Sequence, residues 1–282
     1  MTRLQKRLAY AILIGMFIVL MPLFALNWMF EEFEAEDVSS IAHHFEAKSV
    51  LGVFAHPDDE QLVTGFLIRS SQDPNIKSAV VTATKGEAGT PMPQISRIKD
   101  LGAVRKAEAL KNTWALGVDH HAVLDFPDGG VKDVAPEVLS GAVRDHFLAH
   151  KPDMVVTFWP LSGFSDHPDH KRMGLISERV TLELKANPVD GYSGPDHIAY
   201  ILAPTKMMNR FAGETGKRVV TNQPRPTHAM PGEAWAKLRG WKIHASQRDY
   251  VWHAYKMPPG LVHRLYDKEH YYVLDAEEIP SR

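Results

Sequence analysis

The stretch Ser49-Val50-Leu51-Gly52-Val53-Phe54-Ala55-His56-Pro57-Asp58-Asp59-Glu60 decides how this chain folds. Its first half is a mainly apolar run, which is typical of a strand buried on both faces of a parallel sheet. Just beyond it, Leu62, Phe66 and Leu67 fall on one face of a helix. Because proline suits the first position of a helix, the sequence predicts a strand that ends at His56 and a helix whose first turn carries the carboxylates.

The side chains at this junction also indicate chemistry. Acidic residues in a first helical turn complement the positive end of the helix dipole, which explains Asp58, Asp59 and Glu60 without any ligand. The dipole does not explain the imidazole of His56 beside them. A His and an Asp three residues apart at a strand end are well placed to bind one metal ion.

A second stretch has the same organisation. The strand-like residues 153–159 are followed by Asp166-His167-Pro168-Asp169-His170 and then by a helical pattern. In a parallel sheet both stretches lie at the carboxyl edge, where open α/β folds bind ligands. We therefore expect His56, Asp59 and His170 to bind one ion per chain, with a fourth position left open as in catalytic zinc sites. Iron or manganese could use the same ligands.

Two motifs in this order, Ala55–Glu60 and His167–His170, make the chain similar to the LmbE-like, or PIG-L, family of de-N-acetylases. Four further segments match in order: Thr84–Gly89, Arg105–Glu108, Leu124–Gly129 and His244–Gln247. The resemblance covers residues 48–275. It implies a zinc hydrolase that removes acetyl groups from N-acetylglucosamine-type sugars.

The resemblance also implies roles for individual residues. Asp58 would be the general base that takes a proton from the attacking water, although it could be no more than a partner of the helix dipole. His167 would stabilise the developing oxyanion or protonate the leaving amine, with Asp169 orienting it; the alternative is a hydrogen-bonded loop histidine.

Three more residues are expected at the sugar. The resemblance places Arg105 and Asp128 there. Glu87, which lies in a glycine-flanked loop after the second expected strand, is a comparable candidate. Arg105 and Glu108 also have the i,i+3 spacing of an ordinary surface pair, which needs no ligand.

Residues 8–30 contain no charged side chain and would span roughly 34 Å as a helix, enough to cross a hydrocarbon core of about 30 Å. Basic residues precede this run and acidic residues follow it, which predicts a cytoplasmic N-terminus. We thus expect a cytoplasmic end (1–7), a bilayer anchor (8–30), an acidic connector (31–47) and an extracytoplasmic domain (48–282). A cleaved signal peptide is the alternative, but its apolar core is usually shorter.

From residue 48 the chain alternates strand-like and helix-like segments, which predicts a Rossmann-like, three-layer α/β domain with a mainly parallel sheet. The expected strands are 49–55, 77–84, 120–125, 153–159, 197–203 and, at a sheet edge, 266–274. The expected helices are 59–71, 96–116, 135–149, 169–186 and 232–247. The segments 191–195 and 222–232 are rich in turn residues and could line the sugar site or merely connect elements.

Composition excludes some classes of protein. The 282 residues carry a formal net charge of −2, with a pI of about 6.7, so nothing indicates a nucleic-acid partner. The absence of cysteine excludes disulfides, thiolate zinc sites and a cysteine nucleophile. A zinc amidase for another acyl group, or a sugar-binding relative without turnover, remain as alternatives. The sequence does not choose among cell-wall, exopolysaccharide and lipid-linked sugars, nor does it give the oligomeric state.

Overall fold

A sheet of eight strands runs through the domain in the order β1-β7-β8-β6-β5-β2-β3-β4. The computed structural model describes residues 2–280 of the chain. The strands are β1 (Glu36–Asp37), β2 (Ser49–Phe54), β3 (Lys77–Thr84), β4 (His120–Phe126), β5 (Met154–Phe158), β6 (His197–Leu202), β7 (His228–Pro231) and β8 (Lys268–Asp275). Every neighbouring pair is parallel except those that involve β8.

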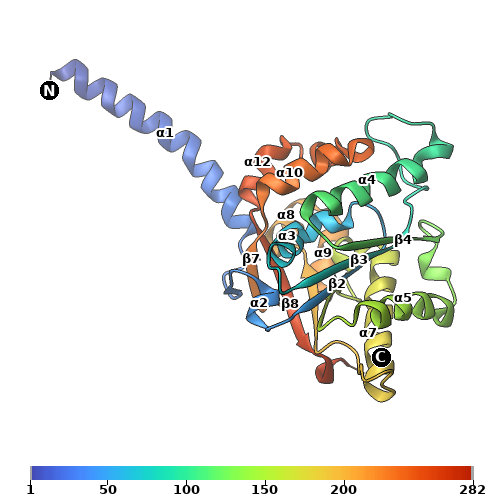
Figure 1. Ribbon diagram of the computed structural model, residues 1–282. Coiled ribbons are helices and arrows are strands. Elements are labelled where there is room, and N and C mark those ends of the chain that lie inside the picture. The colour runs from blue at the N-terminus through green and yellow to red at the C-terminus, as the bar shows by residue number, and fades with distance from the viewer. Residues whose placement is uncertain (1, 281–282) are drawn as a thin grey trace.

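Helices cover both faces of this sheet (Figure 1). The α-helices are α1 (Arg3–Phe30), α2 (Ile41–His44), α3 (Thr64–Gln72), α4 (Leu101–Leu116), α5 (Pro136–His150), α6 (Gly163–Asp166), α7 (Pro168–Ala186), α8 (Thr205–Phe211), α9 (Gly213–Asn222), α10 (Ala234–Ile243), α11 (Tyr250–Tyr255) and α12 (Pro259–Leu265). One core cluster joins the sheet to α5 and α7, and a second joins it to α2, α3, α4 and α10. This confirms the expected three-layer α/β architecture.

The last strand does not lie at an edge, so that prediction was wrong. β8 pairs antiparallel with β6 on one side and with β7 on the other. The turn-rich segment 222–232 supplies β7, and the short β1 extends the sheet beyond it. An interior position suits β8, because Tyr271 in its middle is fully buried.

The helix after β2 begins later than the sequence suggested. Asp58 has φ 92° and ψ −14°, in the left-handed region that a right-handed helix excludes. The chain then passes through a 3-10 turn, η1 (Asp59–Val63), and α3 starts only at Thr64. Asp58 and Asp59 therefore lie in a tight turn and not in the first turn of an α-helix.

The N-terminal helix α1 leaves the domain beside α12, and most of its length is exposed (Figure 1). It is long and apolar enough to cross a membrane, although signal sequences share these properties. Its last turn packs onto the domain. The Phe30 ring is buried and stacks on Tyr266 at a centroid distance of 4.9 Å, and Asn27 Nδ2 donates to the carbonyl of Leu265 at 2.9 Å.

Candidate active site

The structure brings His56, Asp59 and His170 together at the carboxyl edge of the sheet. His56 follows β2, and His170 lies in the first turn of α7 after β5. His56 Nδ1 is 3.2 Å from His170 Nε2, Asp59 Oδ1 is 3.2 Å from His170 Nε2, and Asp59 Oδ2 is 3.6 Å from His56 Nδ1. Two donors at ~2.0–2.1 Å from a tetrahedral zinc ion lie ~3.4 Å apart, so the separations from His170 Nε2 to His56 Nδ1 and to Asp59 Oδ1 are suitable for one ion.

Backbone groups hold two of these side chains in place. Asp59 Oδ2 accepts hydrogen bonds from the backbone N–H groups of Ala55, at 3.1 Å, and His56, at 2.8 Å. His170 Nδ1 lies 2.9 Å from the carbonyl of Gly163, so it donates there and Nε2 is left as the free donor atom. The ring of His170 also stacks on Phe158 at 4.0 Å. Such outer contacts are what fixes the orientation of a metal ligand.

The charge around His56 favours a bound cation. Its Nε2 is 3.2 Å from Asp128 Oδ1 and 3.4 Å from Asp169 Oδ2. Burial disfavours the imidazolium, but the carboxylates of Asp128, Asp169 and Asp59 prevail and raise the pKa of His56 to about 10. Burial likewise opposes ionisation of Asp59, but His170 and His56 hold its pKa below the usual range. A buried group of carboxylates and imidazoles of this kind is a chemically suitable donor set for a divalent ion.

His56 also belongs to two other groupings of potential ligands. The donor atoms of His56, His167 and His170 lie within 4.8 Å of one another, and so do those of His56, Asp128 and Asp169. The half-buried His167 ring has its centroid 4.8 Å from that of His56 and 4.9 Å from that of His170. His167 is therefore a geometric competitor of Asp59 for the third ligand position.

Asp58 faces a different partner from its neighbour. Its Oδ2 accepts a hydrogen bond from Arg105 Nη2 at 3.0 Å. Burial raises the pKa of Asp58, and the positive charge of Arg105 only partly offsets that effect. A carboxylate with a raised pKa beside a potential metal site is suited to accept and return a proton. Its backbone is in the left-handed region, which turns the chain between Asp58 and Asp59.

Arg105 is buried behind this turn. Besides Asp58, it donates to the carbonyl of Pro57 at 2.7 Å and to that of Gly86 at 2.8 Å. Gly86 has φ +67°, and a Cβ there would lie 2.3 Å from the guanidinium, so the glycine makes room for it. Glu108 is also buried and accepts from the backbone N–H of Ser246 at 2.9 Å. The exposed pair between Arg105 and Glu108 that their spacing allows is therefore not what the structure contains.

A buried pair, Glu60 and His244, supports the turn at Asp58. This pair was not predicted from the sequence. Glu60 Oε2 accepts from the Asp58 N–H at 2.9 Å, while Glu60 Oε1 bonds to His244 Nε2 and accepts from Asn112 Nδ2 at 2.8 Å. Burial disfavours the charge on each partner, but their interaction lowers the pKa of Glu60 and raises that of His244. The His244–Gln247 motif was the signal in the sequence that could have indicated this pair. Only the fold shows that His244 contacts Glu60.

The expected sugar-binding residues after β3 and β4 lie in two loops that hydrogen-bond to each other. The Asp128 N–H donates to Glu87 Oε1 at 3.0 Å, and the Ala88 N–H donates to Asp128 Oδ2 at 2.9 Å. Burial opposes ionisation of the Asp128 carboxyl group, but the hydrogen bond to His56 holds its pKa below the usual range. Glu87 is exposed, whereas Asp128 contacts His56.

Asp169 does not hold His167 through its carboxylate. Its Oδ1 accepts from the backbone N–H of Lys132 at 3.1 Å, and its Oδ2 lies near His56 Nε2. The backbone N–H of Asp169 donates to His167 Nδ1 at 3.2 Å. Burial, together with the nearby imidazoles of His170 and His56, lowers the pKa of His167.

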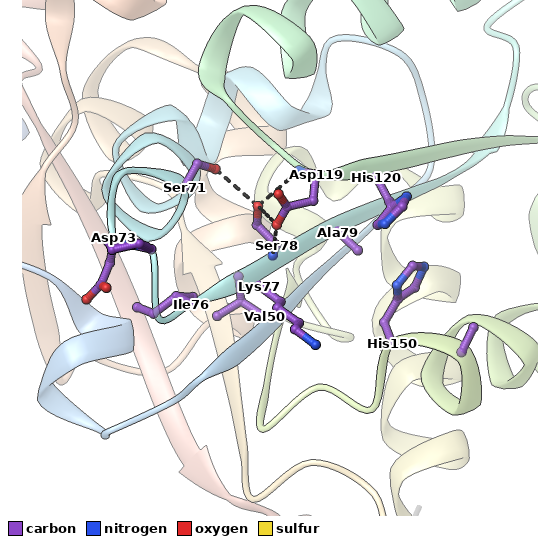
Figure 2. Close-up of a pocket in the computed structure, with 12 residues that line it drawn as sticks. Val50, Ser71, Asp73, Ile76, Lys77, Ser78, Ala79, Asp119, His120 and His150 are labelled. Carbon is purple, nitrogen blue, oxygen red and sulfur yellow. Dashed lines mark hydrogen bonds between the residues drawn. The ribbon is translucent and has the colours of Figure 1, made fainter.

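A polar cavity of about 480 Å³ lies at the opposite, amino-terminal edge of the sheet (Figure 2). Val50, Lys77 and His120, at the starts of β2, β3 and β4, contribute to its lining. Hydrogen bonds among Ser71, Ser78 and Asp119 occupy one side of it. None of the clustered residues described above lines this cavity, so we place the chemistry at the carboxyl edge.

Comparison with known proteins identifies the family of this chain. A family model described as PIG-L, GlcNAc-PI de-N-acetylase, matches residues 51–181. A 1D-myo-inositol 2-acetamido-2-deoxy-alpha-D-glucopyranoside deacetylase from Kineococcus radiotolerans is 26% identical over 293 residues, covering 85% of this chain and 81% of that protein. A probable N-acetyl-alpha-D-glucosaminyl L-malate deacetylase 2 from Bacillus anthracis is 30% identical over 202 residues, covering 71% and 81%.

Among solved structures, the N,N'-diacetylchitobiose deacetylase from Pyrococcus horikoshii superposes with a TM-score of 0.62 at 20% identity, covering 84% of this chain and 87% of that one. At 20% identity the superposition establishes the fold alone. The relatives found by sequence establish the family. The chain belongs to the PIG-L family of metal-dependent de-N-acetylases, which are amide hydrolases.

Proposed function

We propose that this protein is a zinc-dependent hydrolase that removes the N-acetyl group from an N-acetylglucosamine-containing glycoconjugate and releases acetate. His56, Asp59 and His170 would be the ligands of the zinc ion. The observation that carries the proposal is their convergence from two separate segments, with His170 Nε2 3.2 Å from both His56 Nδ1 and Asp59 Oδ1. Another divalent metal could occupy the same donor set.

The bound ion would supply a Lewis acid that polarises the acetamide carbonyl and makes water a better nucleophile. Asp58 is the group that takes the proton from the attacking water, because its carboxylate is separate from the ligand set and has a raised pKa. As the carbon–nitrogen bond breaks, the same proton passes to the leaving nitrogen. The products are then acetate and a sugar with a free amine. Arg105 acts as a positioning residue by holding Asp58 and the preceding carbonyl of Pro57.

His167 is suited to stabilise the developing oxyanion. Its Nδ1 accepts the backbone N–H of Asp169, so the neutral ring carries its proton on Nε2. That N–H is free to donate towards the oxygen on which negative charge develops. The role needs only a hydrogen-bond donor, and not a charged imidazolium.

The relatives support the choice of sugar. The names of the two deacetylases and of the chitobiose enzyme have an N-acetylglucosamine unit in common. In this chain Glu87 and Asp128 would contact its hydroxyl groups; the assignment is supported by the contact of Asp128 with His56 and by the hydrogen bond between the Asp128 N–H and Glu87.

We also propose that α1 is a retained bilayer anchor and that the catalytic domain lies outside the cytoplasm. Retention is supported by the packing of Leu26, Met29 and Phe30 in an apolar cluster of the domain, because cleavage after Phe30 would remove all three side chains. The orientation is supported by Arg3, Lys6 and Arg7 before the apolar run.

The test is release of acetate and free amine by purified full-length protein from N,N'-diacetylchitobiose and from N-acetylglucosamine glycosides. We expect turnover that a chelator abolishes and that added zinc restores. Asp58→Asn should lower this turnover sharply. Release of a longer acyl group with no acetate would favour the other amidase function. Sugar binding without any turnover would favour a non-catalytic relative and refute the proposal.

A further inference from the structure

A largely apolar cavity of about 670 Å³ lies between the end of α1 and the candidate active site. Its apolar lining comes from helices far apart in the sequence: Leu26, Met207, Met208, Phe211, Tyr255 and Met257. Nothing in the proposed chemistry uses these side chains. A sugar would find few partners for its hydroxyl groups among them, whereas a hydrocarbon chain would bury its surface against them favourably.

One end of this cavity adjoins the catalytic residues. Ser165, which also lines the cavity, has its Oγ 3.4 Å from His170 Nδ1. Tyr250 lines it as well, and its partial burial together with the negative charges of Asp58 and Asp59 raises the pKa of its hydroxyl. The cavity therefore begins next to the His170 ring, on the side of its Nδ1 atom.

The other end adjoins the proposed membrane anchor. Leu26 belongs to the uncharged run and lies one turn before the end of α1, so it sits at the outer boundary of the hydrocarbon layer if α1 spans the bilayer. Lys206 of α8, beside Met207, lies 5.1 Å from the ring centroid of Trp28 and 4.8 Å from that of Phe33. Aromatic and cationic side chains grouped in this way are typical of the membrane interface.

The junction between α1 and the domain is a packed contact and not a loose tether. Besides the stacking of Phe30 on Tyr266, Glu32 accepts from the backbone N–H of Thr205 at 2.6 Å, and Lys268 pairs with Glu31 at 3.2 Å. The face of the domain that carries α8 and α12 is therefore held beside α1, as Figure 1 shows for α12. Leu26 of α1 and Met207 of α8 both line the cavity, so the cavity lies at this junction.

We propose that this cavity binds the hydrocarbon chain of a lipid-linked N-acetylated sugar, with the sugar at the metal site and the chain directed towards the bilayer. The inference rests on the proposed function, and it selects the lipid-linked class among the substrates that the sequence left open. It assigns specificity to residues outside the family motifs, in α1, α8 and α11.

The test is a chain-length series of substrates for the full-length protein: methyl, octyl and dodecyl glycosides of N-acetylglucosamine, each below its micelle-forming concentration. Burying one methylene group is worth about 0.8 kcal/mol, or roughly a fourfold change, so partial burial of an octyl chain is sufficient for a tenfold effect. We expect kcat/KM to rise at least about tenfold from methyl to octyl glycoside. Equal kcat/KM for all chain lengths would overturn the inference.

Two variants of neighbouring residues locate the effect. Met208→Asp places a carboxylate in the cavity lining, whereas Asn209→Asp places the same charge at an exposed position of α8 outside the lining. We expect Met208→Asp to abolish the gain from the octyl chain and to keep methyl glycoside activity, while Asn209→Asp retains both. An uncharged variant, Ala212→Trp, should reduce the gain by filling the cavity. An undiminished gain in both cavity variants would contradict the assignment.

Binding of the octyl glycoside, measured by calorimetry, separates this inference from the proposed function. If Met208→Asp weakens binding and Asn209→Asp does not, the cavity assignment stands even if no glycoside is turned over, and only the deacetylase function fails. If turnover occurs but affinity is the same for methyl and octyl glycosides, the function stands and the cavity assignment fails.

Discussion

Asp58 and Asp59 are consecutive in the chain, yet their carboxylates belong to separate networks. Asp58 Oδ2 accepts from Arg105 Nη2 at 3.0 Å, whereas Asp59 Oδ1 lies 3.2 Å from His170 Nε2. The left-handed conformation of Asp58 produces this separation, because it turns the chain sharply between the two side chains. A proton acceptor and a metal ligand can therefore come from adjacent residues.

Substitutions of Asp58 and Asp59 should affect zinc content and turnover differently. Asp58→Asn keeps the size of the side chain but cannot take a proton, so we expect near-normal zinc content with turnover lower by roughly 10²–10⁴. Asp59→Ala removes a charged donor, and zinc affinity should fall together with activity. Metal analysis and amine-release kinetics check both variants. Zinc loss in Asp58→Asn with retention in Asp59→Ala would reverse the roles.

His170→Ala should remove most of the zinc, since two remaining ligands bind the ion weakly. Purified wild-type protein should carry about one zinc per chain, in keeping with one three-ligand site. His167→Ala should keep its zinc and lose turnover, because we assign His167 to the oxyanion. His150→Ala, at the far end of the sheet, is the matched control. If His167→Ala also loses its zinc, His167 and not Asp59 is the third ligand.

The pair of His244 and Glu60 should contribute strongly to stability. His244→Phe leaves the Glu60 carboxylate buried without its cationic partner, so we expect the free energy of unfolding to fall by roughly 3–5 kcal/mol. Urea denaturation measures the change. Adding Glu60→Gln to His244→Phe removes the uncompensated charge and should restore part of the lost free energy of unfolding. A double variant less stable than His244→Phe would show that the charge of Glu60 is not the cause.

Stability should also fall in acid through His270 of β8. This imidazole is buried, and its burial and the nearby charges of Lys268 and Lys237 lower its pKa from 6.5 to about 4. Between those pH values the unfolded chain binds a proton that the folded protein does not, so stability is complete above pH 6.5 and is lost as the pH falls. The maximum loss is roughly 3 kcal/mol.

His270→Phe should therefore flatten the dependence of unfolding free energy on pH between about 6.5 and 4, and leave the slope near pH 8 unchanged. Denaturation in the presence of a chelator keeps zinc release out of the comparison. Parallel curves for wild type and variant across the acid range would show that another group causes the acid sensitivity.

A reporter that is active only after export, fused after Arg282, should be active, because the basic residues before the apolar run orient the N-terminus towards the cytoplasm. A reporter that is active only in the cytoplasm, fused at the same position, should be silent. The opposite pattern would refute the extracytoplasmic location.

Much of the fold was predictable because local patterns suffice for buried strands. The apolar runs indicated β2, β3, β5 and β6 within about one residue at each end, since strands buried on both faces need continuous apolar sequence. The segment that forms β7 was not recognised, because four residues between turn signals carry too little pattern. The interior position of β8 follows from pairing with that missed strand.

The sequence by itself determined the chemistry that is available: two His-Pro-Asp motifs after two strands, an uncharged run long enough to span a bilayer, and no cysteine. Side-chain identity and spacing fix these properties without reference to distant residues. Only the tertiary structure decided which donor atoms meet, that Arg105 and Glu60 hold Asp58 apart from Asp59, and that α1 borders an apolar cavity beside His170. Except for the bond between Glu60 and Asp58, these relationships join residues tens to hundreds of positions apart, and the packing of the whole chain sets them.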